Sequence, residues 1–245
     1  MNKINSRIED IFSHAVALEQ SGRMKNKIYA LNNSIFIMNF DRTVLLRFLL
    51  RKNETSFKNP VSFWANDYDG NQFYEEAGKI IFIQENDGFV RKKSCGTPEE
   101  SPEDIDALFN SFSIPENNIL RLPKTILELM DENLSHIEIS TVEKQLFFIQ
   151  QNIYSGARIE ITRKAGKGFD ITNIQDSIQS DFGPIGMRTG DFAALFSFSN
   201  NISFQFNNGL SDYCYVVNKD RRCEMEGFVS HCLYDELGQI TESRR

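Results

Sequence analysis

GKIIFIQENDG (residues 78–88) and NNISFQFNNGL (residues 200–210) decide the fold of this chain, because the same pattern occurs in both. Apolar and polar residues alternate in each stretch, and a turn that contains Gly follows. Alternation of this kind is typical of a half-buried β-strand. Phe82 in the first stretch corresponds to Phe204 in the second. The pattern therefore predicts two similar halves, each built largely of strands.

The similarity between the halves extends over most of their length. Apolar residues three and four apart predict an amphipathic helix at residues 4–20 and another at 121–133. Strands follow each helix, and neither half shows the strand–helix alternation of a parallel sheet. The distance between matching segments grows from roughly 112 to about 122 residues, the length of a small domain. We therefore predict an α+β fold of two similar domains, each an antiparallel sheet with helices on one face.

Local signals place individual strands and turns. Asp87-Gly88 predicts a hairpin of strands 78–84 and 89–95, since Asp-Gly favours the tight turn that joins such strands. A short helix is expected within 67–77. In the second half, the strands expected near the end of the chain are 191–199, 201–207, 212–218 and 227–234.

GTPEESPEDIDALFNSFSIPENN (residues 96–118) interrupts the pattern with three prolines and a run of acids. We predict that it connects a domain at 1–95 to a domain at 119–245. Ser101 followed by Pro102 is a signal for the start of a helix. We expect the apolar face of that helix to pack on the chain's own sheet, as apolar helix faces usually do. Its members are Ile105, Leu108, Phe109 and Phe112.

Composition indicates the compartment and argues against one class of function. The chain has 245 residues, of which 40% are hydrophobic, and a formal net charge of −7. A protein that simply coats nucleic acid is basic, so the net charge argues against this class, although cations can still gather on one surface. No run of about 18 apolar residues exists, and the first residues lack the apolar core of a signal peptide. We expect a cytoplasmic protein that does not contact a membrane.

The sequence contains no catalytic or metal-binding motif that we can assign. Cys214, Cys223 and Cys232 lack the close pairing of a zinc site, and the three histidines lack it too. One acidic cluster would suit a metal-dependent hydrolase or nuclease, but a solvated loop is the more ordinary interpretation. The cluster comprises Asp67, Asp69, Glu75 and Glu76. We expect a protein that is not an enzyme and needs neither cofactor nor metal.

The segment Met187–Val217 carries a recognisable order of residues. It contains a Met, a Gly-Asp-Phe turn, Leu-Phe-Ser-Phe, a second turn, an alternating strand and Tyr-Cys-Tyr-Val-Val. This order resembles the closing strands of the second domain of DNA polymerase sliding clamps. The first helix and the strand at 78–84 resemble matching parts of the first domain. The chain is therefore similar to the two-domain clamps of tailed phages, which are related to proliferating cell nuclear antigen.

This resemblance implies a function without a catalytic centre. Three two-domain subunits would close head to tail into a homotrimeric ring, with sheets outside and helices around the hole. Duplex DNA would be held by sequence-independent phosphate contacts, while the ring binds a DNA polymerase and a clamp loader. The resemblance implies DNA-facing cations on or beside the first helix of each half: Lys3, Arg7, Arg23, Lys25, Lys27, Arg121 and Lys124.

The resemblance also leaves alternatives open. Clamps carry an apolar pocket near the connector for short peptides of their partners, which implies a partner-binding role for the four apolar residues of 96–118. Asp104–Phe109 also looks like the peptide that partners present, so the alternative function is a non-enzymatic replication or transcription adaptor that docks on a clamp. The subunit edges would be residues 44–50 or 213–217. A phage origin would place the protein in the host cytoplasm.

Overall fold

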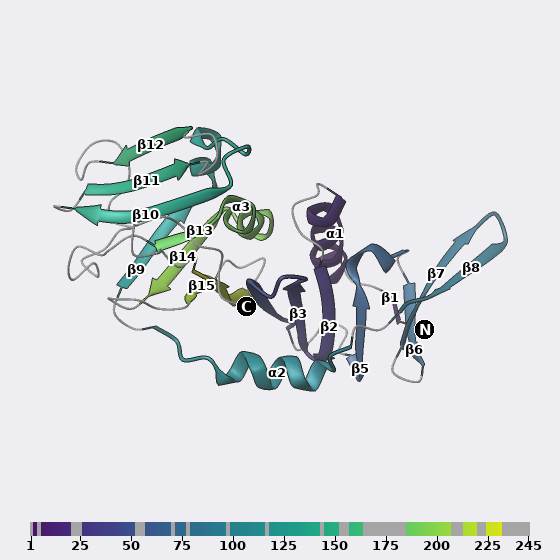
Figure 1. The fold of residues 1–245 in the computed structure, drawn as a ribbon. Coiled ribbons are helices and arrows are strands. Elements are labelled where there is room, and N and C mark those ends of the chain that lie inside the picture. The colour runs from purple at the N-terminus through teal and green to yellow at the C-terminus, as the bar shows by residue number, and fades with distance from the viewer. Residues whose placement is uncertain are drawn as a thin grey trace. The chain divides into compact units, whose positions relative to one another are not determined.

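Two compact units make up the chain in the computed structural model (Figure 1). The first comprises Met1–Ser113 and Lys219–Gly227, and the second comprises Ile114–Asn218 and Phe228–Arg245. The strand β16 (Glu224–Ser230) therefore contributes residues to both units. The structure describes residues 2–3, 6–20, 26–51, 57–69, 72–76, 79–96, 99–115, 118–142, 145–151, 157–163, 185–206, 213–219 and 224–231.

The first unit consists of two antiparallel sheets with helices packed on them. One sheet has the order β5-β2-β3-β4, with β16 next to β4, and the other has the order β1-β6-β7-β8. In chain order the elements are β1 (Asn2–Lys3), α1 (Ser6–Gln20), β2 (Asn26–Asn32), β3 (Ser34–Asn39), β4 (Val44–Leu49), β5 (Phe57–Trp64), the 3-10 helix η1 (Ala65–Asp67), β6 (Gln72–Glu76), β7 (Lys79–Asn86), β8 (Phe89–Ser94) and α2 (Pro102–Ser111).

The helix α1 packs one apolar face on the sheet β5-β2-β3-β4. The ring of Phe12 meets the ring of Phe63 edge to face, with 5.2 Å between centroids. The side-chain amide of Asn26 donates to the carbonyl of Ala15 at 2.9 Å, which ties the start of β2 to the helix. The helix expected at 4–20 is thus present from Ser6 onwards. Its buried face consists of Ile8, Ile11, Phe12, Ala15 and Leu18.

Strand register decides which residues share each face of this sheet. Ile28 lies opposite Phe63, so both side chains share the face that packs on α1. Tyr29 lies opposite Phe36, and Phe36 lies opposite Arg47, so these three share the other face. The helix α2 packs on that second face (Figure 1). The sheet is therefore covered by a helix on both sides.

The strands β7 and β8 form the predicted hairpin. Asp87 and Gly88 have φ values of 48° and 82°, the left-handed backbone that the tight turn needs. Phe82 of β7 packs its ring against Phe63 and Tyr68, at centroid distances of 5.5 and 5.3 Å. One face of the sheet β1-β6-β7-β8 therefore belongs to the core of the first unit.

The second unit also consists of two antiparallel sheets, with the orders β12-β11-β10-β13 and β9-β14-β15-β16. A helix, α3, stacks Phe192 on Phe204 of β14 with 5.7 Å between ring centroids. In chain order the elements are β9 (Asn118–Pro123), the 3-10 helix η2 (Lys124–Leu129), β10 (His136–Val142), β11 (Gln145–Gln151), β12 (Arg158–Arg163), β13 (Ile185–Arg188), α3 (Thr189–Phe198), β14 (Asn201–Phe206), β15 (Tyr213–Lys219) and β16.

The two units repeat one topology. The order β5-β2-β3-β4 has its counterpart in β13-β10-β11-β12, and β1-β6-β7-β8 has its counterpart in β9-β14-β15-β16. This confirms the prediction of two similar α+β domains. It also corrects the alignment of the repeat, because β7, which contains most of 78–88, corresponds to β15 rather than to β14 and the stretch 200–210. The two stretches look alike because alternating strands of one length share a pattern whatever their place in the sheet.

Three local predictions were wrong. Residues 121–133 contain the end of β9 and η2 instead of an α-helix, since β9 pairs along β14 and this pairing outweighs a weak helical period. Residues 191–199 form most of α3 instead of a strand, because an apolar run buried on all sides has no clear period. Within 67–77 the structure has the end of η1 and then the strand β6.

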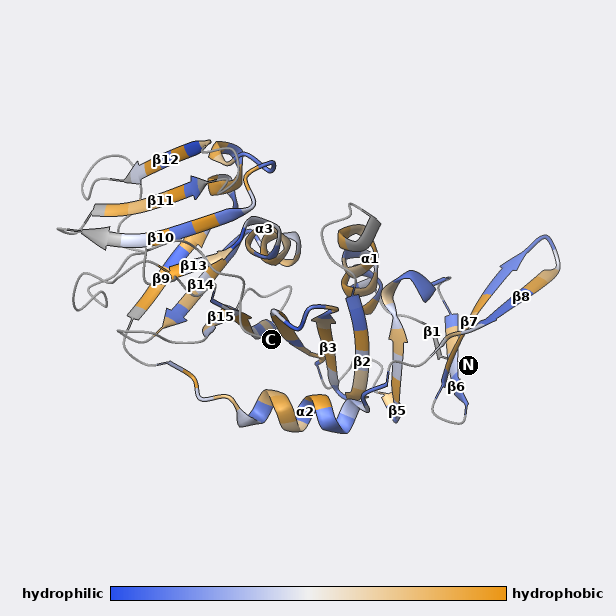
Figure 2. Ribbon diagram, viewed as in Figure 1, coloured by the Kyte–Doolittle hydropathy of each residue, from blue (hydrophilic) through white to orange (hydrophobic). Residues whose placement is uncertain are grey.

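The described helices differ in how their apolar residues are arranged. Figure 2 shows apolar and polar residues on different sides of α2, as expected for a helix with one face on a sheet. In α3, by contrast, most residues are buried. No helix within the described ranges combines the length and the apolar character that a membrane crossing requires.

Candidate functional site

The predicted DNA-facing cations do not form one group. Arg121 in β9 and Lys124 in η2 are exposed, and their charges are available to a partner of the second unit. Lys3 lies in β1. Arg23 and Lys25 lie outside the described residues.

Two of the predicted cations make bonds within the first unit. Arg7 is half-buried, and its Nη2 donates to the carbonyl of Leu49 at 2.8 Å. Lys27 is only 7% exposed, and its Nζ lies 3.0 Å from a carboxylate oxygen of Glu100. Because Lys27 is on the sheet face that α2 covers, it does not point toward α1. We correct the prediction for Lys27, which does not face solvent.

The outer surface of α1 is acidic rather than basic. Arg7, the one cation within the described part of the helix, is engaged with β4. An acidic surface does not attract phosphate by itself. Contact between α1 and DNA would therefore depend on cations supplied from elsewhere. The exposed described residues of α1 are Ser6, Glu9, Asp10, Ser13, His14 and Ala17.

The helix α2 carries three of the four apolar residues predicted for the connector, and Phe112 follows its last residue. Ile105 and Phe109 are 2% and 4% exposed, and the ring of Phe109 lies 5.9 Å from that of Phe36. Leu108 is 39% exposed and Phe112 is half-buried. Burial of the two inward residues on the unit's own sheet leaves them unable to serve as a docking peptide in this conformation. The adaptor alternative therefore finds no support here.

A capping box starts α2 where the sequence predicted it. The backbone N–H of Asp104 donates to the Ser101 hydroxyl at 3.1 Å, and the Asp104 carboxylate accepts from the Ser101 backbone N–H at 3.4 Å. Two backbone N–H groups at the helix start are thus satisfied locally. Pro102 supplies a backbone already suited to the first helical position.

Glu100, just before the cap, joins α2 to the sheet. Its carboxylate accepts hydrogen bonds from Lys27 at 3.0 and 3.2 Å and from the Tyr29 hydroxyl at 3.0 Å, and it pairs with Arg42. Burial by itself would raise the pKa of Glu100, but the bonds from Lys27 and Tyr29 and the charge of Lys27 lower it to about 2. Burial, followed by the adjacent negative charge, raises the pKa of Tyr29. The carboxylate is therefore ionised at neutral pH and neutralises a buried lysine.

Arg47 joins the other end of α2 to the same face. Its guanidinium stacks on the ring of Phe109 with 4.1 Å to the centroid and donates to the side chain of Asn110 at 3.2 Å. Nε and Nη2 both donate to one oxygen of Glu226 in β16, at 2.8 and 2.6 Å. A planar guanidinium can stack and donate in its plane at once, which lysine cannot do. Arg47 thus links β4, β16 and α2.

The acidic cluster is occupied by structural bonds. Asp69 pairs with Arg91 at 3.0 Å, and Asp67 pairs with Lys93 at 3.5 Å. Glu75 accepts from the backbone N–H groups of Lys58 and Asn59. Within the described ranges no three His, Cys, Asp or Glu side chains gather as a metal site would require. Three of the four acidic side chains that the hydrolase hypothesis would use are thus engaged in bonds within the unit.

Two of the four cysteines are described, and both are buried. Burial raises the pKa of Cys95 and of Cys214 to about 12, so neither thiol is a nucleophile near neutral pH. The other cysteines of the proposed spacing, Cys223 and Cys232, lie outside the described residues.

The candidate subunit edges are corrected by the sheet order. β4 lies between β3 and β16, and β15 lies between β14 and β16, so neither 44–50 nor 213–217 is an edge. Among the described strands, β8 ends one sheet of the first unit and β12 ends one sheet of the second. An edge strand presents unpaired backbone groups that another strand can bind.

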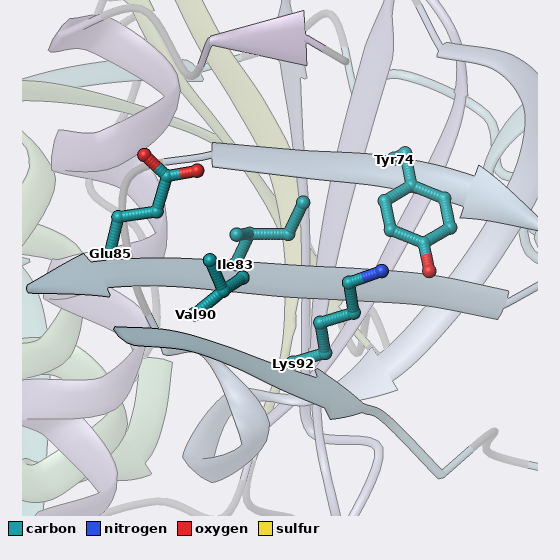
Figure 3. A pocket seen from close by; sticks show the side chains of 5 residues that line it. All are labelled: Tyr74, Ile83, Glu85, Val90 and Lys92. Atoms are coloured by element: carbon teal, nitrogen blue, oxygen red, sulfur yellow. The ribbon is translucent and has the colours of Figure 1, made fainter. Parts of the chain in front are cut away.

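A shallow hollow lies on the outer face of the sheet that ends in β8 (Figure 3). Its volume is about 490 Å³, and Ile83 of β7 lies between Tyr74 of β6 and Val90 of β8. Lys92 places its ammonium 5.8 Å from the centre of the Tyr74 ring, and Glu85 supplies a negative charge to the lining. Val90 is 57% exposed, so this edge combines apolar surface with charge.

Glu100 and Arg47 were not identified as site residues from the sequence. Glu100 is one acid within an acidic run, and nothing in the pattern distinguishes it from Glu99. Arg47 could have been recognised from the sequence, because it is the one charged residue within the apolar stretch 43–50. A charge in such a strand needs a partner, since an unpaired buried charge is costly.

Comparison with models of protein families and with curated protein sequences gives no match. Among solved structures, the proliferating cell nuclear antigen of Entamoeba histolytica is 12% identical with a TM-score of 0.52, over 91% of this chain and 96% of that one. A structure from the PCNA2–PCNA3 complex of Sulfolobus tokodaii is 11% identical with a TM-score of 0.54, over 94% of this chain and 98% of that one. Likeness at this identity concerns the fold alone. The chain has the clamp-like α+β fold of these proteins.

Proposed function

We propose that this chain is one subunit of a DNA sliding clamp, a ring without enzymatic activity that encircles duplex DNA and tethers a DNA polymerase for processive replication. The clamp-like fold over 91% and 94% of the chain in the two comparisons supports this function. The subunit would be of the two-domain phage kind, three copies of which close head to tail. Its further partner would be the clamp loader that opens the ring.

The observation that carries the proposal is which strands of the repeated topology pair and which lie at the end of a sheet. In the first unit β16 lies next to β4, with Arg47 bonded to Glu226 across the pair and Gly227 against the backbone of Leu45. The counterparts of these two strands are β8 and β12, which are both sheet ends. A second copy would repeat the pairing, its β12 adding to β8 of the first. A head-to-tail interface closes a ring when the rotation between neighbouring copies returns to the first copy, as the proposed trimer requires.

The charges on β8 and β12, and the sheet faces on which they lie, favour pairing of these two strands. On β8, Val90 and Lys92 share the outer face of the sheet with Ile83. On β12, Glu160 is exposed, pairs with Arg158 of its own strand at 3.3 Å, and lies on the face away from the buried Phe148. Joining the strands would bring Lys92 within cross-strand reach of Glu160 of the neighbouring copy, and opposite charges in such positions stabilise a sheet. It would also cover the exposed Val90.

The retention of DNA would rest on enclosure more than on attraction. The exposed Arg121 and Lys124 are described candidates for phosphate contact, and we propose Lys3, Arg23 and Lys25 as further contacts. Each phosphate contact steepens the fall of affinity with salt. A ring with few contacts would bind DNA weakly when open and retain it when closed. This combination is what a sliding protein needs.

Sedimentation over a range of concentrations tests the assembly. We expect the wild-type chain to form trimers when concentrated, and Lys92→Glu or Glu160→Lys alone to weaken them by about tenfold through like-charge repulsion. The double variant should restore assembly. Lys124→Glu is the matched control and should assemble normally. A chain that stays monomeric at every concentration, or a double variant no better than either single one, would contradict the proposal.

A topological experiment tests the enclosure. Zero-length crosslinking of Lys92 to Glu160 in the presence of circular duplex DNA should leave protein that stays on the circle at about 1 M salt, where phosphate contacts are screened. Cutting the circle should release it. Equal release from circular and linear DNA would show that the protein does not encircle the duplex.

A further inference from the structure

Residues 100–112, which we call the strap, are held to the first unit's sheet at two polar ends and an apolar centre. At one end Glu100 binds Lys27 and Tyr29. At the other end Phe109 lies under the guanidinium of Arg47. Between them Ile105 is 2% exposed, so the strap crosses the face formed by β2, β3 and β4.

The strap makes a smaller apolar contact than the helix on the opposite face. Three of its side chains are buried, namely Pro102, Ile105 and Phe109, whereas Leu108 is 39% exposed. Its helix starts with its own capping box, so the two backbone donors paired in that box do not need the sheet. A segment with few buried apolar contacts and a locally capped helix start opens at a lower free energy than the core.

The face under the strap is built independently of it. Tyr29, Phe36 and Arg47 are fixed in register by adjacent strands, and Arg47 is held from the side by Glu226. If the strap leaves, Lys27 and Arg42 lose the carboxylate that pairs with them. The exposed face would then offer aromatic surface between positive charges. An acidic, amphipathic helix is the ligand that fits it.

We propose that the strap is the resident occupant of a helix-docking face, and that a partner helix of the same chemistry displaces it. The partner presents a carboxylate ahead of two apolar residues four positions apart, the second of them aromatic. The carboxylate replaces Glu100 between Lys27 and Arg42, and the aromatic ring replaces Phe109 under Arg47. The strap thus inhibits docking by a partner that lacks one of these groups. It would act in this way whether or not the chain closes a ring.

Binding of a peptide in trans measures the competition. The probe is a fluorescein-labelled peptide of residues 99–113, EESPEDIDALFNSFS, added to the full chain. The apparent affinity for the probe scales with the fraction of chains whose face is open. Phe109→Ala in the full chain removes the strap's aromatic anchor and leaves the face intact, so the probe should bind at least about tenfold more tightly than to wild type. Leu108→Ala is the matched control and should change nothing.

A second variant keeps the outcome interpretable. Arg47→Met added to Phe109→Ala removes the group that stacks on the probe, and it should abolish the gain in affinity. Hydrogen exchange should show faster exchange of 102–111 in Phe109→Ala, while the amides of β2 and β3 stay protected and report an intact fold. Equal probe affinity for wild type and Phe109→Ala, with 102–111 released, would overturn the proposal. So would a gain that survives Arg47→Met.

Because these measurements need neither DNA nor a second copy, their failure is distinguishable from failure of the ring. A monomeric chain that binds the probe as expected would support the proposal for the strap and contradict the proposal of a sliding clamp. A trimer whose probe affinity does not respond to Phe109→Ala would do the reverse.

Discussion

The two faces of the sheet β5-β2-β3-β4 are covered by helices that are attached in different ways. On one face α1 buries five apolar residues, and Phe12 packs between Phe63 and Tyr68 at 5.2 and 5.4 Å. On the other face α2 relies on Glu100 and Arg47, with a narrower apolar contact between them. The first attachment is a hydrophobic core, and the second combines ion pairs with one stacked ring.

This difference predicts which helix can leave the sheet without unfolding of the whole unit. Apolar burial is non-directional and is lost only when the core opens, so α1 should leave the sheet only on global unfolding. Ion pairs and a capped helix exchange one partner for another of like chemistry at little cost, because the charges remain paired. The same sheet therefore carries a fixed layer and an exchangeable layer. The predictions below test this contrast, starting with the largest expected effect.

Phe12→Ala should destabilise the chain by about 3–5 kcal/mol, because it removes a fully buried ring and leaves a cavity among other rings. Urea unfolding followed by circular dichroism measures the loss. Phe89→Ala is the matched control, since Phe89 is 81% exposed, and its effect should stay within about 0.5 kcal/mol. Equal effects of the two variants would show that α1 does not hold the core.

Gly227→Ala should cost about 1–3 kcal/mol through overpacking. A Cβ at this position would lie 2.5 Å from the Leu45 carbonyl oxygen and 2.6 Å from Cδ2 of Leu46, so β16 would have to move away from β4. Gly96→Ala is the control, because nothing lies within 4 Å of its Cβ. The same urea titration compares them. A neutral Gly227→Ala would mean that β16 does not approach β4 so closely.

Phe109→Ala should lower global stability less than Phe12→Ala, by on the order of 1–2 kcal/mol, although both rings are buried. If the strap opens separately from the rest of the unit, the stability lost in Phe109→Ala cannot exceed the free energy with which the strap docks on the sheet. Urea unfolding by circular dichroism gives the global value, and native-state hydrogen exchange of 102–111 gives the local one. A loss as large as that of Phe12→Ala would place α2 in the fixed layer.

The sequence predicted what local pattern controls. The helix α1, the Asp-Gly hairpin and the capped start of α2 at Ser101 all follow from short-range rules, and each is present. The doubled α+β topology also follows, since the strands of both halves carry the same alternation. The pairing of specific strands does not, because alternating strands of similar length are interchangeable in pattern. This is why 78–88 was aligned with β14 instead of β15.

The candidate sites depend on contacts between residues far apart in the chain. Glu100 meets Lys27 across 73 positions, and Arg47 meets Glu226 across 179. No local rule gives such partners, so Lys27 was expected to face DNA, whereas it is buried. The failure at 121–133 has a similar cause, because Arg121 pairs with Ser203 of β14. In both places tertiary contacts outweighed the local signal.

Acid should release the strap before it weakens α1. The pKa of Glu100 in the folded chain is about 2, against 4.5 for an ordinary glutamate, so its stabilising contribution is complete above about pH 4.5 and is lost as the pH falls toward 2. Trp64, the single tryptophan, lies 5.2 Å from Nζ of Lys27 and should report the change by fluorescence. Glu100→Gln, which keeps the shape and removes the charge, should show the released signal at neutral pH and no transition in this window. A wild-type transition that persists in Glu100→Gln would mean that another carboxylate holds α2, and the exchangeable layer would then have a different anchor.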